Sequence, residues 1–150
     1  MKRPTTLAVV SVGMVLTAIG TLVFWITFLA DLEAQRTGYP ATQSAGWFAW
    51  ELSFPLADGW MAATALAGGI GLWRRRPAGL LTGLVSGGAM VFLGLMDGLF
   101  FLQNELYLPL TGEVAVELAI HLWMIGFGLL SIGAIWQHRA DLIDCQEVVT

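Results

Sequence analysis

The chain contains four apolar segments, each long enough to cross a lipid bilayer as a helix. They cover about residues 7–30, 54–73, 78–102 and 114–136. A helix rises about 1.5 Å per residue, so about 20 apolar residues span the hydrocarbon core. The sequence therefore predicts an all-α, polytopic membrane protein. We expect an antiparallel bundle of four transmembrane helices that forms a single domain over residues 1–150.

Composition supports a membrane protein and excludes several other classes. Hydrophobic residues make up 57% of the 150 residues and charged residues only 12%, whereas a soluble domain carries about a quarter charged residues. The excess apolar surface is therefore expected to face the lipid bilayer. The net charge of −4 and the lack of a basic stripe argue against a nucleic-acid partner. A single cysteine, Cys145, excludes an intrachain disulfide and a CxxC redox or zinc motif.

The basic residues predict the orientation in the membrane. Cytoplasmic loops carry an excess of Lys and Arg. Only Arg36 lies on one side of the predicted bundle, and the other six basic residues lie on the opposite side: Lys2, Arg3, Arg74, Arg75, Arg76 and Arg139. Both termini are therefore predicted to be cytoplasmic, with residues 138–150 as a short cytoplasmic tail. We expect a multi-pass protein of the plasma (inner) membrane of a prokaryote.

The breaks between the segments and the small residues within them predict how the helices pack. The turn at 74–77 is so short that it permits only an antiparallel hairpin. Thr111 is expected to cap the fourth helix, with Glu113 in its first turn. Small residues let membrane helices approach closely. The glycines that repeat every four residues in the third segment are therefore expected to pack helices within one chain: Gly79, Gly83 and Gly87.

Four ionisable residues lie inside the apolar segments: Asp58, Asp97, Glu117 and His121. A charge at mid-bilayer costs about 2.5–3.5 kcal/mol on insertion scales, so exposing all four to lipid would cost on the order of 10 kcal/mol. They should therefore point into the bundle. The rise per residue places all four in the half of the membrane that faces away from the cytoplasm. This predicts one outward-facing polar pocket with several acids and one histidine.

Asp97 and His121 are the candidate catalytic pair of this pocket, because a buried acid beside a histidine can donate and accept protons near neutral pH. Glu117 shares a helical face with His121, and Asn104 shares one with Asp97. The remaining candidates are expected to bind a ligand together with these: Glu51, Asp58, Trp60, Asn104, Glu117 and Trp123.

Two further points concern the spacing of the acidic residues. Glu51 and Asp58 share a face if a helix runs on from Trp50 through Pro55. Glu117-x-x-x-His121 could supply two metal ligands, but di-metal carboxylate bundles use Glu-x-x-His motifs on two helices. A mononuclear site with Asp97 and Asp58 is the alternative, but the sequence gives it little support. We predict no metal and no other cofactor.

A resemblance to a known family covers residues 47–123. Its elements are Trp50-Glu51 before an apolar segment, Pro55, a basic turn that ends in Pro77, Asp97-Gly98-Leu99-Phe100-Phe101-Leu102, and His121-Leu122-Trp123. In these elements the chain resembles the EXPERA group of membrane proteins, which includes sterol isomerases and sigma-type receptors. The resemblance implies an intramembrane pocket for a sterol-like or other hydrophobic, amine-like ligand, with Glu51 and Asp97 as polar anchors. The chain has Trp25 and Asp31 where the isomerases have a histidine and an acid, and His121 in place of an asparagine.

Several functions follow from these observations. The first is an integral membrane protein whose pocket binds a lipid or small hydrophobic ligand, with isomerase-like proton transfer as its chemistry. The alternative is a non-catalytic accessory or assembly subunit with a membrane-protein partner, in which the polar residues form a structural network. A transporter is disfavoured, because the inner halves of the segments offer only hydroxyl groups.

Overall fold

The computed structural model describes residues 4–38 and 46–143, and all the regular structure in these two stretches is helical. Four helices are long: α1 (Thr5–Ala30), α4 (Pro55–Trp73), α5 (Pro77–Gln103) and α6 (Gly112–Gln137). Three are short: α2 (Leu32–Gly38), α3 (Trp47–Glu51) and α7 (Arg139–Ile143). The four long helices coincide, within a few residues, with the four apolar segments of the sequence.

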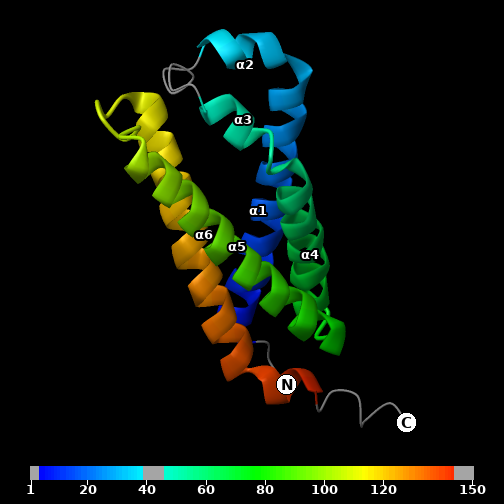
Figure 1. The fold of residues 1–150 in the computed structure, drawn as a ribbon. Coiled ribbons are helices and arrows are strands. Elements are labelled where there is room, and N and C mark those ends of the chain that lie inside the picture. The colour runs from blue at the N-terminus through cyan, green and yellow to red at the C-terminus, as the bar shows by residue number, and fades with distance from the viewer. Residues whose placement is uncertain (1–3, 39–45, 144–150) are drawn as a thin grey trace.

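The long helices pack side by side in chain order (Figure 1). Helix α1 packs along α4, α4 along α5, and α5 along α6, whereas α1 and α6 touch over only a short stretch. Helices α2 and α3 and the α5–α6 connection lie at one end of the molecule, which we call the α3 end. The tight turn between α4 and α5 lies at the other end, which we call the arginine end, and α1 begins there too.

Three of the helices, α1, α5 and α6, are long and apolar enough to cross a membrane. Their outward faces carry large exposed hydrophobic side chains, such as Leu16 on α1 and Phe92 on α5. These features make the chain a multi-pass helical membrane protein in contact with the bilayer. Helix α4 is shorter, with 19 residues, and its hydropathy is reduced by Asp58 and by its glycines.

The beginning of each of the last two long helices follows from its sequence. Pro77 is at the first position of α5, where its missing N–H breaks no helical hydrogen bond. The Thr111 side chain accepts a hydrogen bond of 3.3 Å from the N–H of Val114, and Glu113 lies in the first turn of α6. The capping role predicted for Thr111 is therefore confirmed.

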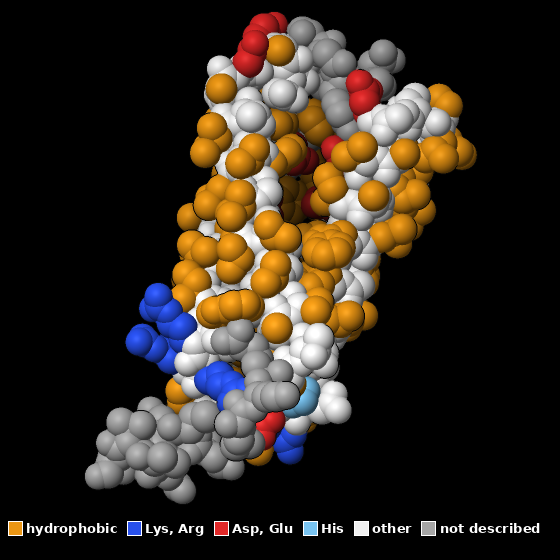
Figure 2. Space-filling model, turned by 180° about the vertical axis from the view of Figure 1, so that it is seen from behind, with side chains coloured by type: hydrophobic (Ala, Val, Ile, Leu, Met, Phe, Trp, Pro, Cys, Tyr) orange, Lys and Arg blue, Asp and Glu red, His pale blue; other side chains and the backbone are white. Residues whose placement is uncertain are grey.

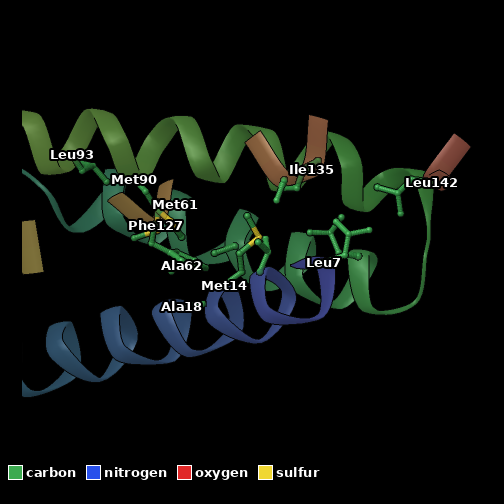
Figure 3. Close-up of a cluster of buried hydrophobic side chains, with 14 residues drawn as sticks. Leu7, Met14, Ala18, Met61, Ala62, Met90, Leu93, Phe127, Ile135 and Leu142 are labelled. Atoms are coloured by element: carbon green, nitrogen blue, oxygen red, sulfur yellow. The ribbon is translucent and has the colours of Figure 1, made fainter. Parts of the chain in front are cut away.

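The main hydrophobic core runs along the four long helices towards the arginine end (Figure 3). Met14 on α1, Met61 on α4 and Met90 on α5 are completely buried. Leu142 on α7 also packs into this core and is 1% exposed. Part of the predicted tail is thus a docked helix, whereas residues 144–150 lie outside the described residues. Burying Leu142 removes an apolar side chain from water and holds α7 in place.

Glycines hold α4 and α5 together near the arginine end. A Cβ built on Gly71 would lie 2.6 Å from the Cα of Gly79, and one on Gly68 would lie 2.9 Å from the Cα of Gly83. Such distances leave no room for a side chain. The predicted packing role of Gly79 and Gly83 within one chain is confirmed.

The continuous helix considered for residues 50–58 is wrong. Helix α3 ends at Glu51 and α4 begins at Pro55, with a turn between them in which the N–H of Phe54 donates to the Glu51 carbonyl over 3.0 Å. A proline in a helix interior clashes with the carbonyl four residues earlier, which here belongs to Glu51. The chain therefore turns at this point, and α3 points in a different direction from α4 (Figure 1).

Candidate functional site

A cavity of about 330 Å³ lies between the long helices in the half of the molecule towards the α3 end. Its lining combines an apolar wall with carboxyl and imidazole groups. Figure 2 shows the molecule from behind, and acidic side chains are visible at the bottom of a hollow between two columns of hydrophobic side chains. The residues that line it are Thr17, Gly20, Thr21, Phe24, Glu51, Asp58, Met61, Leu93, Gly94, Asp97, Phe101, Glu117, Ile120, His121, Trp123 and Met124.

The hollow opens between α1 and α6, the two neighbouring helices that contact each other least. The indole N–H of Trp123 on α6 donates to the hydroxyl of Thr17 on α1 over 3.1 Å and closes the gap on the arginine side. Phe127 stacks on Trp123 with ring centroids 4.7 Å apart and fills the space over Gly13 of α1. Beyond Trp123, towards the α3 end, the opening is bordered by small or apolar groups such as Gly20 and Ile120.

Two aspartates in the cavity accept hydrogen bonds from tryptophans on other helices. The indole N–H of Trp25 on α1 donates to Asp58 on α4 over 2.8 Å, and that of Trp50 on α3 donates to Asp97 on α5 over 3.1 Å. An indole N–H can only donate, so each bond orients a carboxyl oxygen as an acceptor. One oxygen of each aspartate is held in this way, and the aspartates link pairs of elements across the cavity.

His121 is held by a tyrosine in the α5–α6 connection. The hydroxyl of Tyr107 is 2.7 Å from Nδ1 of His121, and the histidine is only 4% exposed. The ring of Phe101 packs against both residues, with centroids 5.2 Å from Tyr107 and 5.0 Å from His121. Burial, followed by the charges of Asp97 and Glu117, raises the pKa of the Tyr107 phenol, so the hydroxyl carries a proton at neutral pH.

Glu51 reaches the cavity from α3, which aromatic packing holds in place. Trp50 stacks on Phe100 of α5 with centroids 4.6 Å apart, and Trp47 is 3% exposed and packs beside Phe28 of α1. Burial raises the pKa of Glu51 to about 8, and the carboxylates of three other residues add to the rise. These are, in order of their effect, Asp97, Glu117 and Asp58. Glu51 is therefore protonated at neutral pH and can donate a hydrogen bond into the cavity.

Six of the eight residues singled out from the sequence line this one cavity: Glu51, Asp58, Asp97, Glu117, His121 and Trp123. The other two do not. Trp60 is 63% exposed on the outer surface of α4. Asn104 is exposed just beyond the end of α5, where its side-chain amide donates to the carbonyl of Phe100 over 2.8 Å.

Trp25, Trp50 and Tyr107 were not among the residues expected at the site. Trp25 carried a usable signal, because an indole N–H inside an apolar segment needs an acceptor on another helix. Trp50 and Tyr107 lie outside the apolar segments, where tryptophan and tyrosine are common simply because they favour the membrane interface. Among residues 4–38 and 46–143, no group of three or more His, Cys, Asp or Glu side chains has the geometry to hold a metal ion.

The fold and the cavity together define a class: a multi-pass, all-helical membrane protein with an acidic cavity among its helices. Comparison of the chain with protein-family models, with curated proteins and with solved structures finds no match in any of the three. Its function therefore has to be inferred from the cavity itself.

Proposed function

We propose that the chain binds a membrane-soluble molecule that carries a cationic, hydrogen-bond-donating group such as a protonated amine. The observation that carries this proposal is the composition of the cavity lining. Among the described residues, four carboxyl groups and one imidazole line a space that is otherwise apolar apart from two threonine hydroxyls, and none of these lining residues is Lys or Arg. A ligand with a positive group would supply the missing charge, and its apolar part would contact side chains such as Met61 and Leu93.

The opening of the cavity supports entry from the bilayer. The gap between α1 and α6 is flanked by exposed apolar side chains, as in the orange columns beside the hollow in Figure 2. A molecule dissolved in lipid can reach the carboxyl groups through such a gap without crossing water. A lipid or a small hydrophobic ligand fits this route better than a soluble, polar one.

The proposed arrangement in the membrane is an antiparallel four-helix transmembrane bundle with α4 as its fourth span. The turn between α4 and α5, at the arginine end, carries Arg74, Arg75 and Arg76 (Figure 1). An excess of basic residues at this end supports the proposal of cytoplasmic termini, with the cavity in the half of the membrane that faces away from the cytoplasm. We propose the plasma membrane of a prokaryote as its location.

Proton transfer to or from the bound molecule is the chemistry proposed for this site. Asp97 and His121 line the same cavity, and the protonated Glu51 adds a donor. The EXPERA-like elements of the sequence point to the same kind of ligand and to isomerase-like chemistry. General acid–base catalysis needs donors and acceptors within reach of one ligand, and the position of these three groups around one cavity supports the proposal.

The ligand class is tested with two probes of equal chain length, N,N-dimethyldodecylamine and dodecanol. The wild-type protein in detergent micelles is expected to bind the amine at least tenfold more tightly than the alcohol, because a hydrogen bond to a charged group contributes about 1.5–3 kcal/mol. Asp97→Asn is expected to remove most of this preference while the protein still folds, because an asparagine oxygen also accepts the hydrogen bond from Trp50. Calorimetric titration measures both affinities.

Glu105→Gln, on the exposed α5–α6 connection, is the matched control and should keep the wild-type preference. Equal affinity of the wild-type protein for the amine and the alcohol would contradict the proposed ligand class. If Asp97→Asn keeps the preference for the amine, Asp97 does not bind the cationic group.

The route of entry is tested with Gly20→Phe. Gly20 lines the cavity, and a Cβ built on it meets no atom within 4 Å, so the backbone at this position has room for a side chain. We expect amine binding to fall at least tenfold, because the ring fills the gap that the ligand uses. Gly133→Phe on α6 is the control, since Gly133 is equally free of neighbours and does not line the cavity. If Gly20→Phe binds the amine as the wild type does, the ligand enters elsewhere.

A further inference from the structure

Tyr107 lies between His121 and the surface of the molecule at the α3 end. Its hydroxyl is 2.7 Å from Nδ1 of the histidine, and the residue itself is half-buried in the connection between α5 and α6. The other ring nitrogen, Nε2, forms no hydrogen bond in the part of the chain that the structure describes, and His121 lines the cavity. The imidazole therefore has one nitrogen on the tyrosine and the other available to the cavity.

The position of the hydroxyl is fixed by packing. Phe101 contacts the rings of both Tyr107 and His121. Gly98 on α5 lies beneath the hydroxyl. A Cβ built on this glycine would be 3.6 Å from the hydroxyl oxygen, which is already van der Waals contact. A larger side chain at Gly98 would take the space that the phenol occupies. The pair is thus positioned by α5 as well as by its own hydrogen bond.

We propose that Tyr107 and His121 form a proton relay between water at the α3 end and the cavity. The proposal deepens the proposed function, because it names the source of the protons for the bound molecule. In the resting pair the phenol donates to Nδ1, and Nε2 carries the imidazole proton towards the cavity. Tyr107 is a positioning and relay residue, since it contacts the histidine and does not line the cavity.

The transfer balances without a further reagent besides water. The Nε2–H bond breaks as its proton moves to the bound molecule, and Nδ1 takes the phenolic proton at the same time. The phenol oxygen recovers a proton from a hydronium ion or water on the aqueous side. The reverse sequence restores the starting pair and carries a proton out: Nε2 takes a proton from the cavity, Nδ1 gives its proton to the phenol oxygen, and the proton that the phenol held leaves to water.

The ionisable groups around His121 fit a donor role for Nε2–H. Asp97 on α5, Glu117 on α6, Glu51 on α3 and Asp58 on α4 line the same cavity, and α1 contributes Thr17 and Thr21 but no ionisable group to the lining. Carboxyl oxygens accept hydrogen bonds, so they favour the form of the imidazole that presents N–H to the cavity.

The test measures the His121 ring by ¹⁵N NMR, in the absence of any ligand. The chain has two histidines, so His138→Gln in ¹⁵N-histidine-labelled protein leaves only the His121 signals. In this background Tyr107→Phe is expected to slow exchange of the His121 ring N–H with water at least tenfold and to shift the Nδ1 signal to that of an unpartnered nitrogen. Backbone amide exchange along α6 should not change, which separates a relay from a merely structural role.

Two outcomes would overturn the relay. One is an unchanged rate of ring N–H exchange in Tyr107→Phe, which would mean that protons reach the ring directly from the cavity. The other is an Nδ1 signal typical of a nitrogen without a hydrogen-bond partner in the protein that still has Tyr107, which would mean that the phenol does not bond to the histidine. Because these measurements use no ligand, they are independent of the amine titration, and either proposal can fail while the other stands.

Discussion

Glu51→Gln is expected to make the protein markedly more stable at pH 9 and to leave its stability at pH 4 almost unchanged. Burial of Glu51 raises its pKa from 4.5 to about 8 in the folded state. The folded protein therefore binds more protons than the unfolded chain between these two values, and stability falls as the pH rises through this window. The neutral amide of glutamine removes this dependence.

The expected effect is large. A pKa raised from 4.5 to about 8 corresponds to a penalty of about 3–5 kcal/mol for the charged carboxylate. The wild-type protein has the full contribution of the neutral Glu51 below pH 4.5 and loses it progressively up to pH 8 and above. At pH 9 the melting temperature of Glu51→Gln in detergent should exceed that of the wild type by on the order of 10 °C.

The measurement is a thermal denaturation series from pH 4 to pH 9, followed by circular dichroism on both proteins. Glu105→Gln should give the same curve as the wild type, because this carboxylate is exposed at the same end of the molecule. Parallel curves for the wild type and Glu51→Gln would mean that the Glu51 carboxyl is solvated in both states, and that the acids of the cavity do not act on it.

The positions of the long helices and the grouping of the acids could be predicted from the sequence, because both depend on properties of single segments: apolar length, helix capping and the cost of a charge in lipid. Apolar length fixed the helices, and Thr111 fixed the start of α6 through its capping side chain. The penalty for ionisable groups in lipid required Asp58, Asp97, Glu117 and His121 to face the interior. Since all four lie near the same end of their helices, they line one cavity.

Trp60 and Asn104 were predicted to line the cavity and do not, and each has a reason in helix geometry. Trp60 is two residues from Asp58, and two residues of an α-helix turn by about 200°, so the two side chains lie on nearly opposite faces. Asn104 is on the face of Asp97 by periodicity, but α5 ends at Gln103 and the Asn104 side chain bonds back to the helix. The rotation around the helix axis is enough to exclude Trp60 from the cavity, and Asn104 lies beyond the last turn of α5.

The aromatic partners of the cavity could not be derived in the same way. Trp25, Trp50 and Tyr107 reach their acceptors only because α1, α3 and the α5–α6 connection are brought together by the fold. The partner residues are 14 to 47 positions apart in the chain. Their pairing depends on helix directions and on the turn between α3 and α4, neither of which follows from periodicity.

The other prediction with a large expected effect concerns the contact between α4 and α5 at the arginine end. A Cβ built on Gly79 would overlap the backbone nitrogen of Leu72 and would lie 2.9 Å from the Cα of Gly71. Backbone atoms cannot move aside as a flexible side chain can, and the turn that joins α4 to α5 is only a few residues long. Gly79→Ala therefore has to separate the two helices at their closest contact.

We expect Gly79→Ala to lower the free energy of unfolding by about 3 kcal/mol or more, even though alanine favours a helix over glycine by about 1 kcal/mol. Gly83→Ala should have a smaller effect, because its nearest neighbour is the flexible end of Ile135 at 2.8 Å. Gly88→Ala is the control on the same helix. No atom lies within 4 Å of its Cβ position, so this variant should be as stable as the wild type or slightly more stable.

This order of stability, Gly88→Ala above Gly83→Ala above Gly79→Ala, also connects the helix contact to the cavity. Helices α4 and α5 touch most closely near the arginine end, while their cavity residues Asp58 and Asp97 lie towards the α3 end. A wider spacing at the contact changes the angle at which the helices diverge, and so the distance between the two aspartates. Gly79→Ala should therefore lose amine binding together with stability, whereas Gly88→Ala should keep both. Thermal denaturation and the amine titration on the three variants test this directly, and an equal stability of all three would show that the glycines are not in contact.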